Sequence, residues 1–320
     1  GDTLGIGSLN GLYTYQLKSR QLNHFDSKQT GLPHNTIYSI IHTKDNQIYI
    51  GTYNGLCRYV QASGKFENIL LPVNRGGSNL FVNSLLEDTT RQCIWIGMEG
   101  YLFQYNPTIG EMKAIEVFHN NSIKSLALDG DENLLAGTDN GLYVYQNDKE
   151  PLQHIIHDSR NIQSLTNNII WNIFSDQEHN IWLGTDYGIS LSRYNSALQF
   201  VPISQITGTG DGNQFYSLFR DSKGFYWFGG TNGVIRFTHP AGNKHDAIWY
   251  RMGDKNHPLS HNRIRHIYED REQQLWIATD GSTNRYDYNT HQFVHYNIVD
   301  STGTYNTCLL YTSDAADDMQ

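Results

Sequence analysis

Apolar residues recur along the chain in short runs that are separated by turn-forming residues. "NTIYSII", "IYIGTYNGLCRY" and "KFENI" follow one another early in the chain, and "NIIWNIF", "IWLGTDYGISLSRY" and "LQF" follow one another further on. These runs are rich in β-branched and aromatic residues and are bounded by Gly, Asn and Asp, which is the pattern of strands joined by tight turns. No segment keeps an apolar period of ~3.6 residues, so helices are nearly excluded.

The central string of this pattern is repeated seven times. Its copies share a Gly that follows an aromatic–apolar pair, with Ala in the last copy: Gly7, Gly51, Gly97, Gly137, Gly184, Gly229 and Ala278. Consecutive copies lie 40 to 49 residues apart. This is the period of propeller blades, and each unit supplies four strand-like pieces. The sequence therefore predicts an all-β fold, a β-propeller of about seven four-stranded blades over residues 1–307.

The residues that recur in the repeat are those that a blade needs. The large ring of the second strand suits the interface between blades: Tyr49, Trp95, Trp182, Trp227 and Trp276. An Asp after the first strand starts a turn: Asp88, Asp129, Asp176, Asp221 and Asp270. An Asn precedes the first strand in most units: Asn35, Asn121, Asn168, Asn213 and Asn262. Because these residues occur in nearly every unit, we expect structural roles for them.

The two ends of the chain determine whether the first blade is complete and the ring closes. The chain supplies three strands of its first blade, beginning near Thr3, so the last residues would have to provide the missing inner strand if the ring closes. The ring can also be incomplete, with the seven units spanning two adjoining propellers. The sequence leaves both arrangements open.

Composition and charge exclude several functions. The chain of 320 residues has a formal net charge of −9 and no cluster of Lys and Arg, so no nucleic acid is expected to bind this region. No apolar run approaches the ~20 residues that span a bilayer. The 3 cysteines show no CxxC spacing and are expected to be free thiols.

Sequence motifs for catalysis and metal binding are missing. The chain contains no GxSxG, HExxH or P-loop string, and most of its acidic residues occupy turn positions of the repeat. Its 14 His residues show no convincing metal spacing. We therefore expect no catalytic residue, no metal and no cofactor in this chain.

Binding residues are expected in two sets of loops, those before the first strand and those between the second and third strands of each unit. These loops open onto one face of a propeller and carry amides, carboxylates and aromatic rings, the mixture that binds sugar hydroxyls and C–H faces. Residues that vary between units are the better candidates, because the fold does not require them. The predicted ligand-binding set is Tyr53, Trp171, Asp186, Tyr187, Asn213, Asn262, Arg263 and Arg265.

Three strings carry a resemblance to a known family. "GLPHNTIYSIIHTKDNQIYIGTYNGLCRY", "FYSLFRDSKGFYWFGGTNGVIRF" and "LSHNRIRHIYEDREQQLWIATDGSTNRYDYNTHQFVHYNI" resemble the two-component-regulator propeller repeat. The chain is similar to the extracytoplasmic sensor region of hybrid two-component histidine kinases of Bacteroides-type bacteria, over Asp2–Thr307. Such sensors carry two consecutive seven-bladed propellers, followed by an immunoglobulin-like domain, a membrane helix, a kinase, a receiver and a DNA-binding output domain.

The resemblance implies a function and a location. It implies a periplasmic, ligand-sensing fragment of an inner-membrane protein that recognises an oligosaccharide and controls polysaccharide-utilisation genes. It also implies a homodimer in the full-length receptor and membrane attachment only through segments that this chain lacks. Two alternatives stay open: a propeller enzyme that acts on polysaccharide as a lyase or hydrolase, and a protein-interaction propeller.

The last residues depart from the repeat. "CLLYTSDAADD" follows "TYNT" where the repeat predicts another strand and Asp. The string can be back-translated into the transposase end and adapter used in shotgun DNA sequencing. We therefore expect residues 308–320 to be translated adapter rather than native sequence, which a different codon series in the underlying DNA would contradict.

Overall fold

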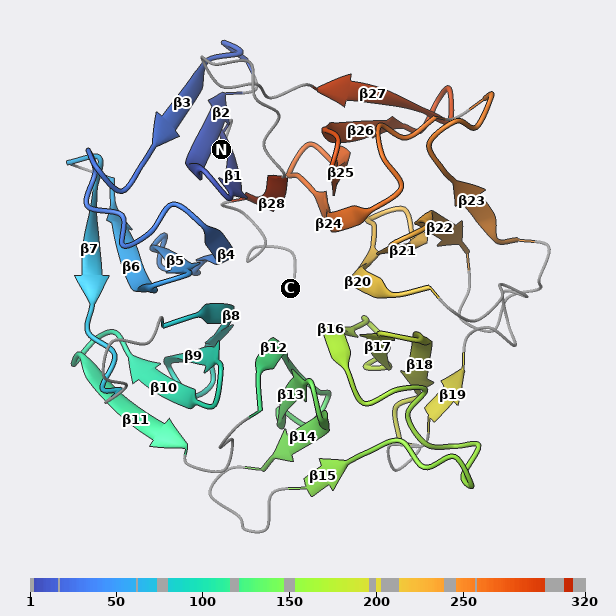
Figure 1. The fold of residues 1–320 in the computed structure, drawn as a ribbon, viewed down its shortest axis with the longest axis horizontal. Helices are drawn as coiled ribbons and strands as arrows, with labels where there is room; N and C mark the ends of the chain where they lie inside the picture. Colours follow the sequence, from blue (N-terminus) through green and yellow to red (C-terminus); the bar gives the residue numbers. More distant parts are fainter. Residues whose placement is uncertain are drawn as a thin grey trace. The chain divides into compact units, whose positions relative to one another are not determined.

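The computed structural model describes residues 3–16, 18–61, 63–73, 80–115, 121–146, 153–195, 200–202, 213–238, 246–256, 258–296 and 308–312. These residues form strands and turns without an α-helix, so they contain no helix that could cross a membrane. The strands group into seven four-stranded antiparallel sheets, one for each repeat. The fold is the all-β, seven-bladed β-propeller that the repeat predicts (Figure 1).

Three blades belong to a first compact unit, built mainly from Gly1–Ile123. The first blade contains β1 (Thr3–Ser8), β2 (Gly11–Gln16) and β3 (Leu22–Phe25). The second contains β4 (Ile37–His42), β5 (Ile48–Thr52), β6 (Gly55–Val60) and β7 (Lys65–Ile69). The third contains β8 (Val82–Asp88), β9 (Cys93–Met98), β10 (Leu102–Asn106) and β11 (Glu111–Ile115).

The fourth strand of the first blade comes from the end of the chain. β28 (Cys308–Thr312) pairs antiparallel with β1, with Leu4 opposite Thr312 and Ser8 opposite Cys308. This is the place in which the missing strand was expected. The adapter origin of residues 308–320 stays a prediction, and residues 313–320 lie outside the described part of the chain.

Four blades belong to a second compact unit, built mainly from Lys124–Glu269 and Gln273–Tyr296. They contain β12 (Ile123–Leu128), β13 (Leu134–Thr138), β14 (Gly141–Tyr145) and β15 (Gln153–Ile155); then β16 (Ile170–Ser175), β17 (Ile181–Thr185), β18 (Gly188–Ser192) and β19 (Phe200–Pro202). The last two contain β20 (Phe215–Arg220), β21 (Tyr226–Gly230), β22 (Gly233–Phe237) and β23 (Ile248–Tyr250); then β24 (Ile264–Glu269), β25 (Leu275–Thr279), β26 (Thr283–Asp287) and β27 (Gln292–Tyr296). Within this unit β12, β16, β20 and β24 occupy the same edge of successive sheets (Figure 1).

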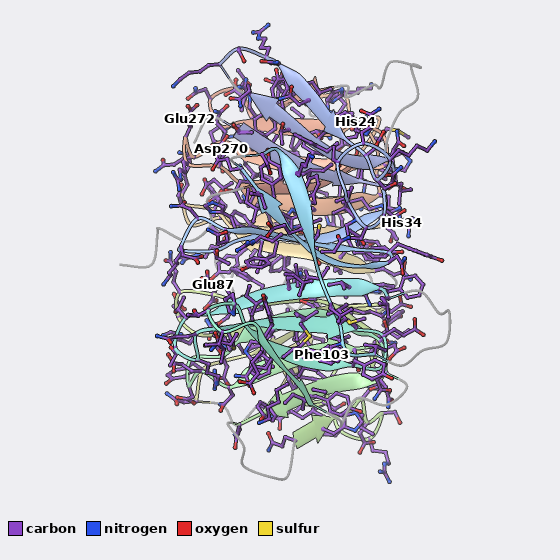
Figure 2. The ribbon with its side chains drawn as sticks, turned by 90° about the vertical axis from the view of Figure 1, so that its left-hand side faces the viewer. His24, His34, Glu87, Phe103, Asp270 and Glu272 are labelled. Carbon is purple, nitrogen blue, oxygen red and sulfur yellow. The ribbon has the colours of Figure 1, made fainter. Side chains whose placement is uncertain are left out.

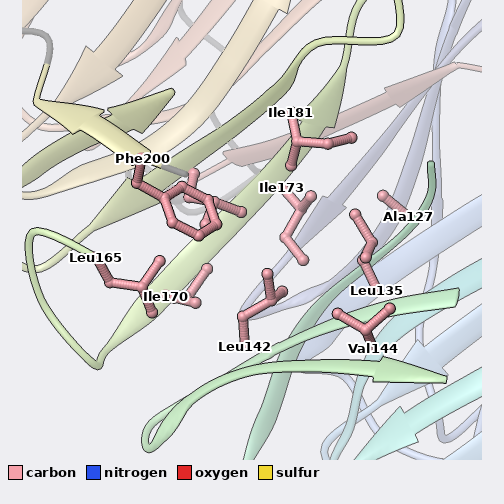
Figure 3. Packing of buried hydrophobic residues seen from close by; sticks show 10 residues of the cluster. Ala127, Leu135, Leu142, Val144, Leu165, Ile170, Ile173, Ile181 and Phe200 are labelled. Atoms are coloured by element: carbon pink, nitrogen blue, oxygen red, sulfur yellow. The ribbon is translucent and has the colours of Figure 1, made fainter. Parts of the chain in front are cut away.

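Apolar side chains fill the space between neighbouring blades. In the second unit Leu142 and Val144 of β14 pack with Ile170 of β16, Ile181 of β17 and Phe200 of β19 (Figure 3). These side chains come from two sheets packed face to face, because alternate residues of a strand point to opposite faces. In the first unit Phe103 of β10, labelled in Figure 2, is fully buried and belongs to one apolar cluster with Tyr49 and Leu56 of the second blade.

The recurrent Trp lies at the blade interface, as predicted, and the recurrent Asp supports it. Trp182 is fully buried among residues of the next blade, including Tyr226 and Phe228. Its Nε1–H donates to Oδ2 of Asp176 at 2.8 Å. The same bond joins Trp95 to Asp88 at 3.0 Å and Trp227 to Asp221 at 2.7 Å. The Asp therefore satisfies the polar atom of a ring that the core must bury.

The recurrent Asn connects one blade to the next. The backbone N–H of Gly188, the first residue of β18, donates to the carbonyl oxygen of Asn213 at 3.0 Å, and that of Gly233, the first residue of β22, donates to the carbonyl oxygen of Asn262 at 2.7 Å. Both glycines have positive φ, at 88° and 94°, which other residues adopt only with strain. These bonds, accepted by the backbone carbonyl, fix the loop of each blade to the segment that leads into the next inner strand. The side chain also holds backbone, since Asn168 Oδ1 accepts from the N–H of His157 at 2.6 Å, which confirms the structural role expected of the Asn.

Candidate functional site

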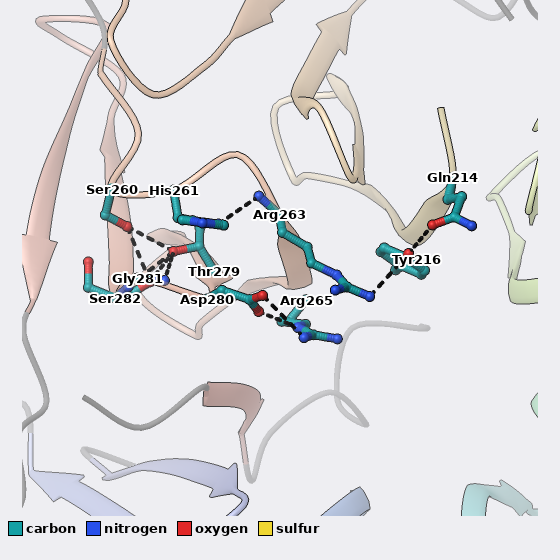
Figure 4. A network of polar contacts seen from close by, with 10 residues as sticks. All are labelled: Gln214, Tyr216, Ser260, His261, Arg263, Arg265, Thr279, Asp280, Gly281 and Ser282. Carbon is teal, nitrogen blue, oxygen red and sulfur yellow. Dashed lines mark hydrogen bonds and ion pairs between the residues drawn. The ribbon is translucent and has the colours of Figure 1, made fainter. Parts of the chain in front are cut away.

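A chain of polar and aromatic side chains runs across three blades of the second unit. It contains the predicted residues Trp171, Asp186 and Arg263, together with Gln214 and Tyr216, which the sequence analysis did not select. Trp171 and Tyr216 lie near the start of β16 and β20, Asp186 lies in the loop after β17, and Gln214 and Arg263 each precede an inner strand. All five side chains are partly buried. We call this set the polar chain; Figure 4 shows its Gln214, Tyr216 and Arg263.

Asp186 lies at one end of the polar chain and accepts two hydrogen bonds on one oxygen. Trp171 Nε1–H donates to Oδ1 at 3.0 Å, and Gln214 Nε2–H donates to the same oxygen at 2.6 Å. No described residue donates a hydrogen bond to Oδ2. The carboxylate is therefore held in one orientation and keeps an acceptor for another group.

Arg263 lies at the other end of the polar chain. Tyr216 OH donates to Gln214 Oε1, and Arg263 Nη2–H donates to Tyr216 OH at 3.5 Å. The guanidinium carbon lies 5.5 Å from the centroid of the Tyr216 ring. No carboxylate pairs with Arg263 among the described residues, and its buried Nε–H has no hydrogen-bond partner there. A guanidinium carries five N–H donors. The buried Nε–H is closed to a ligand, whereas the Nη donors other than the one on Tyr216 OH remain.

Two aromatic rings lie between these polar ends. The rings of Trp171 and Tyr216 meet edge to face, with centroids 5.3 Å apart and planes at 75°. Lys124 of β12 places its Nζ 4.5 Å from the centroid of Trp171. Aromatic faces, a carboxylate, an amide and cations thus gather on one unit, which is the combination that binds hydroxylated molecules.

Arg265 is engaged differently from Arg263. Its Nε lies 2.5 Å from Oδ1 of Asp280, and its Nη2 lies 3.2 Å from Oδ2 (Figure 4). This two-point contact fixes the guanidinium. Arg265 therefore has fewer donors left for a ligand than Arg263, although both were predicted to bind one.

The remaining predicted residues of the second unit lie beside the polar chain. Asn213 Oδ1 accepts from Thr231 Oγ1 at 2.6 Å and from the N–H of Asn232 at 3.0 Å. Asn262 Oδ1 accepts from the N–H of Met252 at 2.7 Å. Both amides hold loop backbone, and Tyr187 is 49% exposed in the loop after β17. Their roles in binding a ligand stay predictions.

Tyr53 belongs to the first unit, where it forms an aromatic cluster. Its ring centroid lies 4.8 Å from that of His34, 4.5 Å from that of Phe81 and 6.4 Å from that of Tyr38. All four rings are partly buried. Burial raises the pKa of the Tyr38 hydroxyl, and the nearby Tyr53 adds to this effect. The cluster offers ring faces but none of the carboxylates found in the second unit.

Metal ligation finds no support in the described part of the chain, where no three His, Cys, Asp or Glu side chains gather as ligands. Cys57 and Cys93 are buried free thiols, and burial raises the pKa of both. A thiol in this state is a poor nucleophile.

Comparison with known families identifies the repeat. The model of the two-component regulator propeller matches residues 31–54, 164–187, 209–232 and 258–281. These blades are two-component regulator propeller repeats. Each match ends in the loop after the second strand of its blade. The stretches matched by the family model include four residues of the polar chain: Asp186, Gln214, Tyr216 and Arg263.

The chain is similar to an extracellular domain of known structure. It is 82% identical to the extracellular domain of a putative hybrid two-component system of B. thetaiotaomicron, with a TM-score of 0.60. The match covers 96% of this chain and 41% of that domain, so the chain spans less than half of its relative.

More distant structures share the fold alone. PorZ, a component of the type-IX secretion system of Porphyromonas gingivalis, is 14% identical, with a TM-score of 0.67 over 96% of this chain and 52% of its own. Virginiamycin B lyase from Staphylococcus aureus is 12% identical, with a TM-score of 0.62 over 83% of this chain and 85% of its own. The comparison with curated proteins gave no match.

Proposed function

We propose that this propeller is part of the periplasmic sensor of a hybrid two-component histidine kinase and that it recognises an oligosaccharide. The similarity to the extracellular domain of such a system supports the sensor role. The oligosaccharide is proposed from the polar chain of this protein. In the full-length receptor, which we expect to be a homodimer, binding would control the genes for use of the polysaccharide.

One observation carries the proposal of a sugar ligand. The polar chain places the open Oδ2 of Asp186 and the open N–H groups of Arg263 on either side of the Trp171 and Tyr216 rings. A carboxylate accepts from neighbouring sugar hydroxyls, and a guanidinium donates to them. An aromatic ring covers the apolar C–H face of a pyranose. A sugar unit satisfies all three kinds of group together.

Signalling requires more than binding. A ligand shifts the receptor between two arrangements only if it binds one of them more tightly than the other. The polar chain draws on three blades of one compact unit, so a bound sugar would tie these blades together. The two arrangements belong to the whole receptor and are part of the proposal.

A binding screen with an enzymatic control tests this function. The chain is titrated calorimetrically with cello-, galacto-, manno- and arabino-oligosaccharides and with a uronic acid series, and the same mixtures are analysed for shortened or unsaturated products. We expect saturable binding of one series without any product. Product formation would instead support the propeller-enzyme alternative, and the absence of binding to every series would contradict sugar sensing.

A further inference from the structure

The inner strands of five blades share an irregularity in their pairing. In each of them one residue near the start of the strand is skipped in the register with the neighbouring strand, which forms a β-bulge. We call the skipped residue the bulge residue. In chain order the bulge residues are Tyr38, Asn83, Trp171, Tyr216 and Arg265.

The residue before each bulge residue belongs to the core. These residues are at most 4% exposed, and all are large and apolar: Ile37, Val82, Ile170, Phe215 and Ile264. They fill the space between blades, as Ile170 does in Figure 3. A polar residue at this position would leave an unpaired group in the core. The position before the bulge is therefore fixed by the fold.

The residue after the bulge connects neighbouring blades. Ser217 Oγ accepts from the N–H of Ile267 in the next inner strand at 2.9 Å. Asn172 Oδ1 accepts from the N–H of Leu218 at 3.3 Å. In the first unit Ser39 Oγ donates to the carbonyl oxygen of Val82 at 3.2 Å. This position is also committed to the fold.

The bulge residue varies in chemistry from blade to blade. All five are partly buried, and they belong to four residue types. Trp171 and Arg265 reach the loop after the second strand of their own blade, where Trp171 donates to Asp186 and Arg265 pairs with Asp280. Asn83 instead joins its blade to the next, because its Nδ2–H donates to Ser122 Oγ at 3.3 Å and to the carbonyl oxygen of Ile123 at 3.1 Å.

A bulge bends its strand locally and re-aims the side chain of the extra residue. Each of these five blades thus presents one side chain of variable type between a core residue and, in three of them, a residue that bonds the next blade.

We infer that the bulge residue is the specificity-determining position of each blade and that Trp171 and Tyr216 select the sugar bound by the second unit. This inference rests on the proposed function and deepens it. Two rings at adjacent bulges favour a pyranose unit that offers a flat C–H face, with its hydroxyls in reach of Asp186 and Arg263. Tyr38 gives the first unit an aromatic bulge of its own, and Asn83 gives it an amide.

The test compares bulge variants with a core variant on the full chain. Trp171→Ala, Tyr216→Ala and the control Trp182→Phe are titrated with the oligosaccharide series named above. Loss of a ring that covers a sugar should lower the affinity for the preferred sugar by about 10-fold or more. Because other sugars use that ring less, the order of affinities across the series should change. Trp182 lies in the core of the blade that contains Trp171, so the Trp182→Phe variant should keep the wild-type order of affinities across the series.

Each outcome decides the inference. A changed order in both bulge variants, with an unchanged order in Trp182→Phe, supports it. If the wild type binds a sugar and neither bulge variant changes its affinity or the order, the inference is overturned while the proposed function stands. If no sugar in the series binds to the wild type, both are overturned.

Discussion

The indole Nε1 of Trp182 lies 2.8 Å from Oδ2 of Asp176 and donates a hydrogen bond to it, inside the interface between two blades. In the same blade the indole of Trp171 makes the same kind of bond to Asp186, but both of those residues are partly open to solvent. One Trp–Asp pair recurs in other blades and supports the core, whereas the other belongs to the polar chain. The two pairs allow stability and binding to be tested separately.

Truncation of the two tryptophans should affect the free energy of unfolding very differently. Trp182→Ala removes a fully buried ring and should cost about 4 kcal/mol. Trp171→Ala removes a partly exposed ring and should cost about 1 kcal/mol or less. Urea denaturation of both variants measures the difference. Equal losses would show that Trp171 also serves the core.

Removal of the Asp176 carboxylate, which accepts the hydrogen bond from Trp182, should destabilise the fold even though no apolar contact is lost. Asp176 Oδ2 also accepts from Tyr226 OH at 3.1 Å and from Asn180 Nδ2–H at 3.0 Å. Asp176→Ala leaves these buried donors unpaired and should cost about 3 kcal/mol. Glu111→Gln, at an exposed position of β11, is the control and should stay within about 0.5 kcal/mol of the wild type in urea denaturation. A cost at Asp176 as small as the control's would refute this role.

The recurrent Gly of the second strand should tolerate no larger residue where the next blade approaches it by its backbone. A Cβ at Gly184 would lie 2.6 Å from the carbonyl oxygen of Phe215. At Gly229 it would lie 2.4 Å from Cγ2 and 2.8 Å from Cβ of the fully buried Ile264, atoms that the backbone of β24 holds in place. Gly184→Ala and Gly229→Ala should therefore each cost about 2 kcal/mol. Thermal unfolding of both variants measures the two costs, and an unchanged stability in either variant would contradict the argument.

His266 should make the fold less stable in acid. Burial lowers the pKa of this imidazole to about 4, from an ordinary value of 6.5. Between these values the unfolded chain takes up a proton that the folded chain does not, so stability falls as the pH drops from 6.5 to about 4. At ~1.4 kcal/mol per pH unit the loss approaches about 3 kcal/mol.

Denaturation of the wild type and of His266→Gln across this pH range isolates the effect, because all other titrating groups are shared. The wild type should lose more stability than the variant as the pH falls. Parallel profiles for the two proteins would exclude His266 as the source.

The blades were predictable from the sequence because they rest on repeated, local signals. The recurrent Trp, the turn-forming Asp and the Asn before each inner strand appear in almost every unit, and each has a role that depends on its own blade or the next one. The bond from Trp182 to Asp176 was not predicted. A Trp and an Asp that recur at a constant spacing could have indicated it.

The polar chain was predictable only in part. Trp171 and Arg263 were selected because they vary between units, and Asp186 was selected because it lies in a loop between the second and third strands. Tyr216 and Gln214 were missed, because strand alternation alone does not show that a bulge turns Tyr216 toward the loops. Asn213 and Asn262 were included in the ligand-binding set although they recur in the repeat, and their amide oxygens hold loop backbone, in line with the structural role expected of the recurrent Asn.

The central claim is that the polar chain binds an oligosaccharide through the open oxygen of Asp186, and Asp186→Asn tests it most directly. This variant keeps the shape of the side chain and an acceptor for Trp171 and Gln214, but it replaces one carboxylate oxygen by an amide donor. Calorimetric titration with the sugar that the wild type prefers should show a loss of affinity of about 10-fold or more at unchanged thermal stability. Unchanged affinity in Asp186→Asn would contradict the claim.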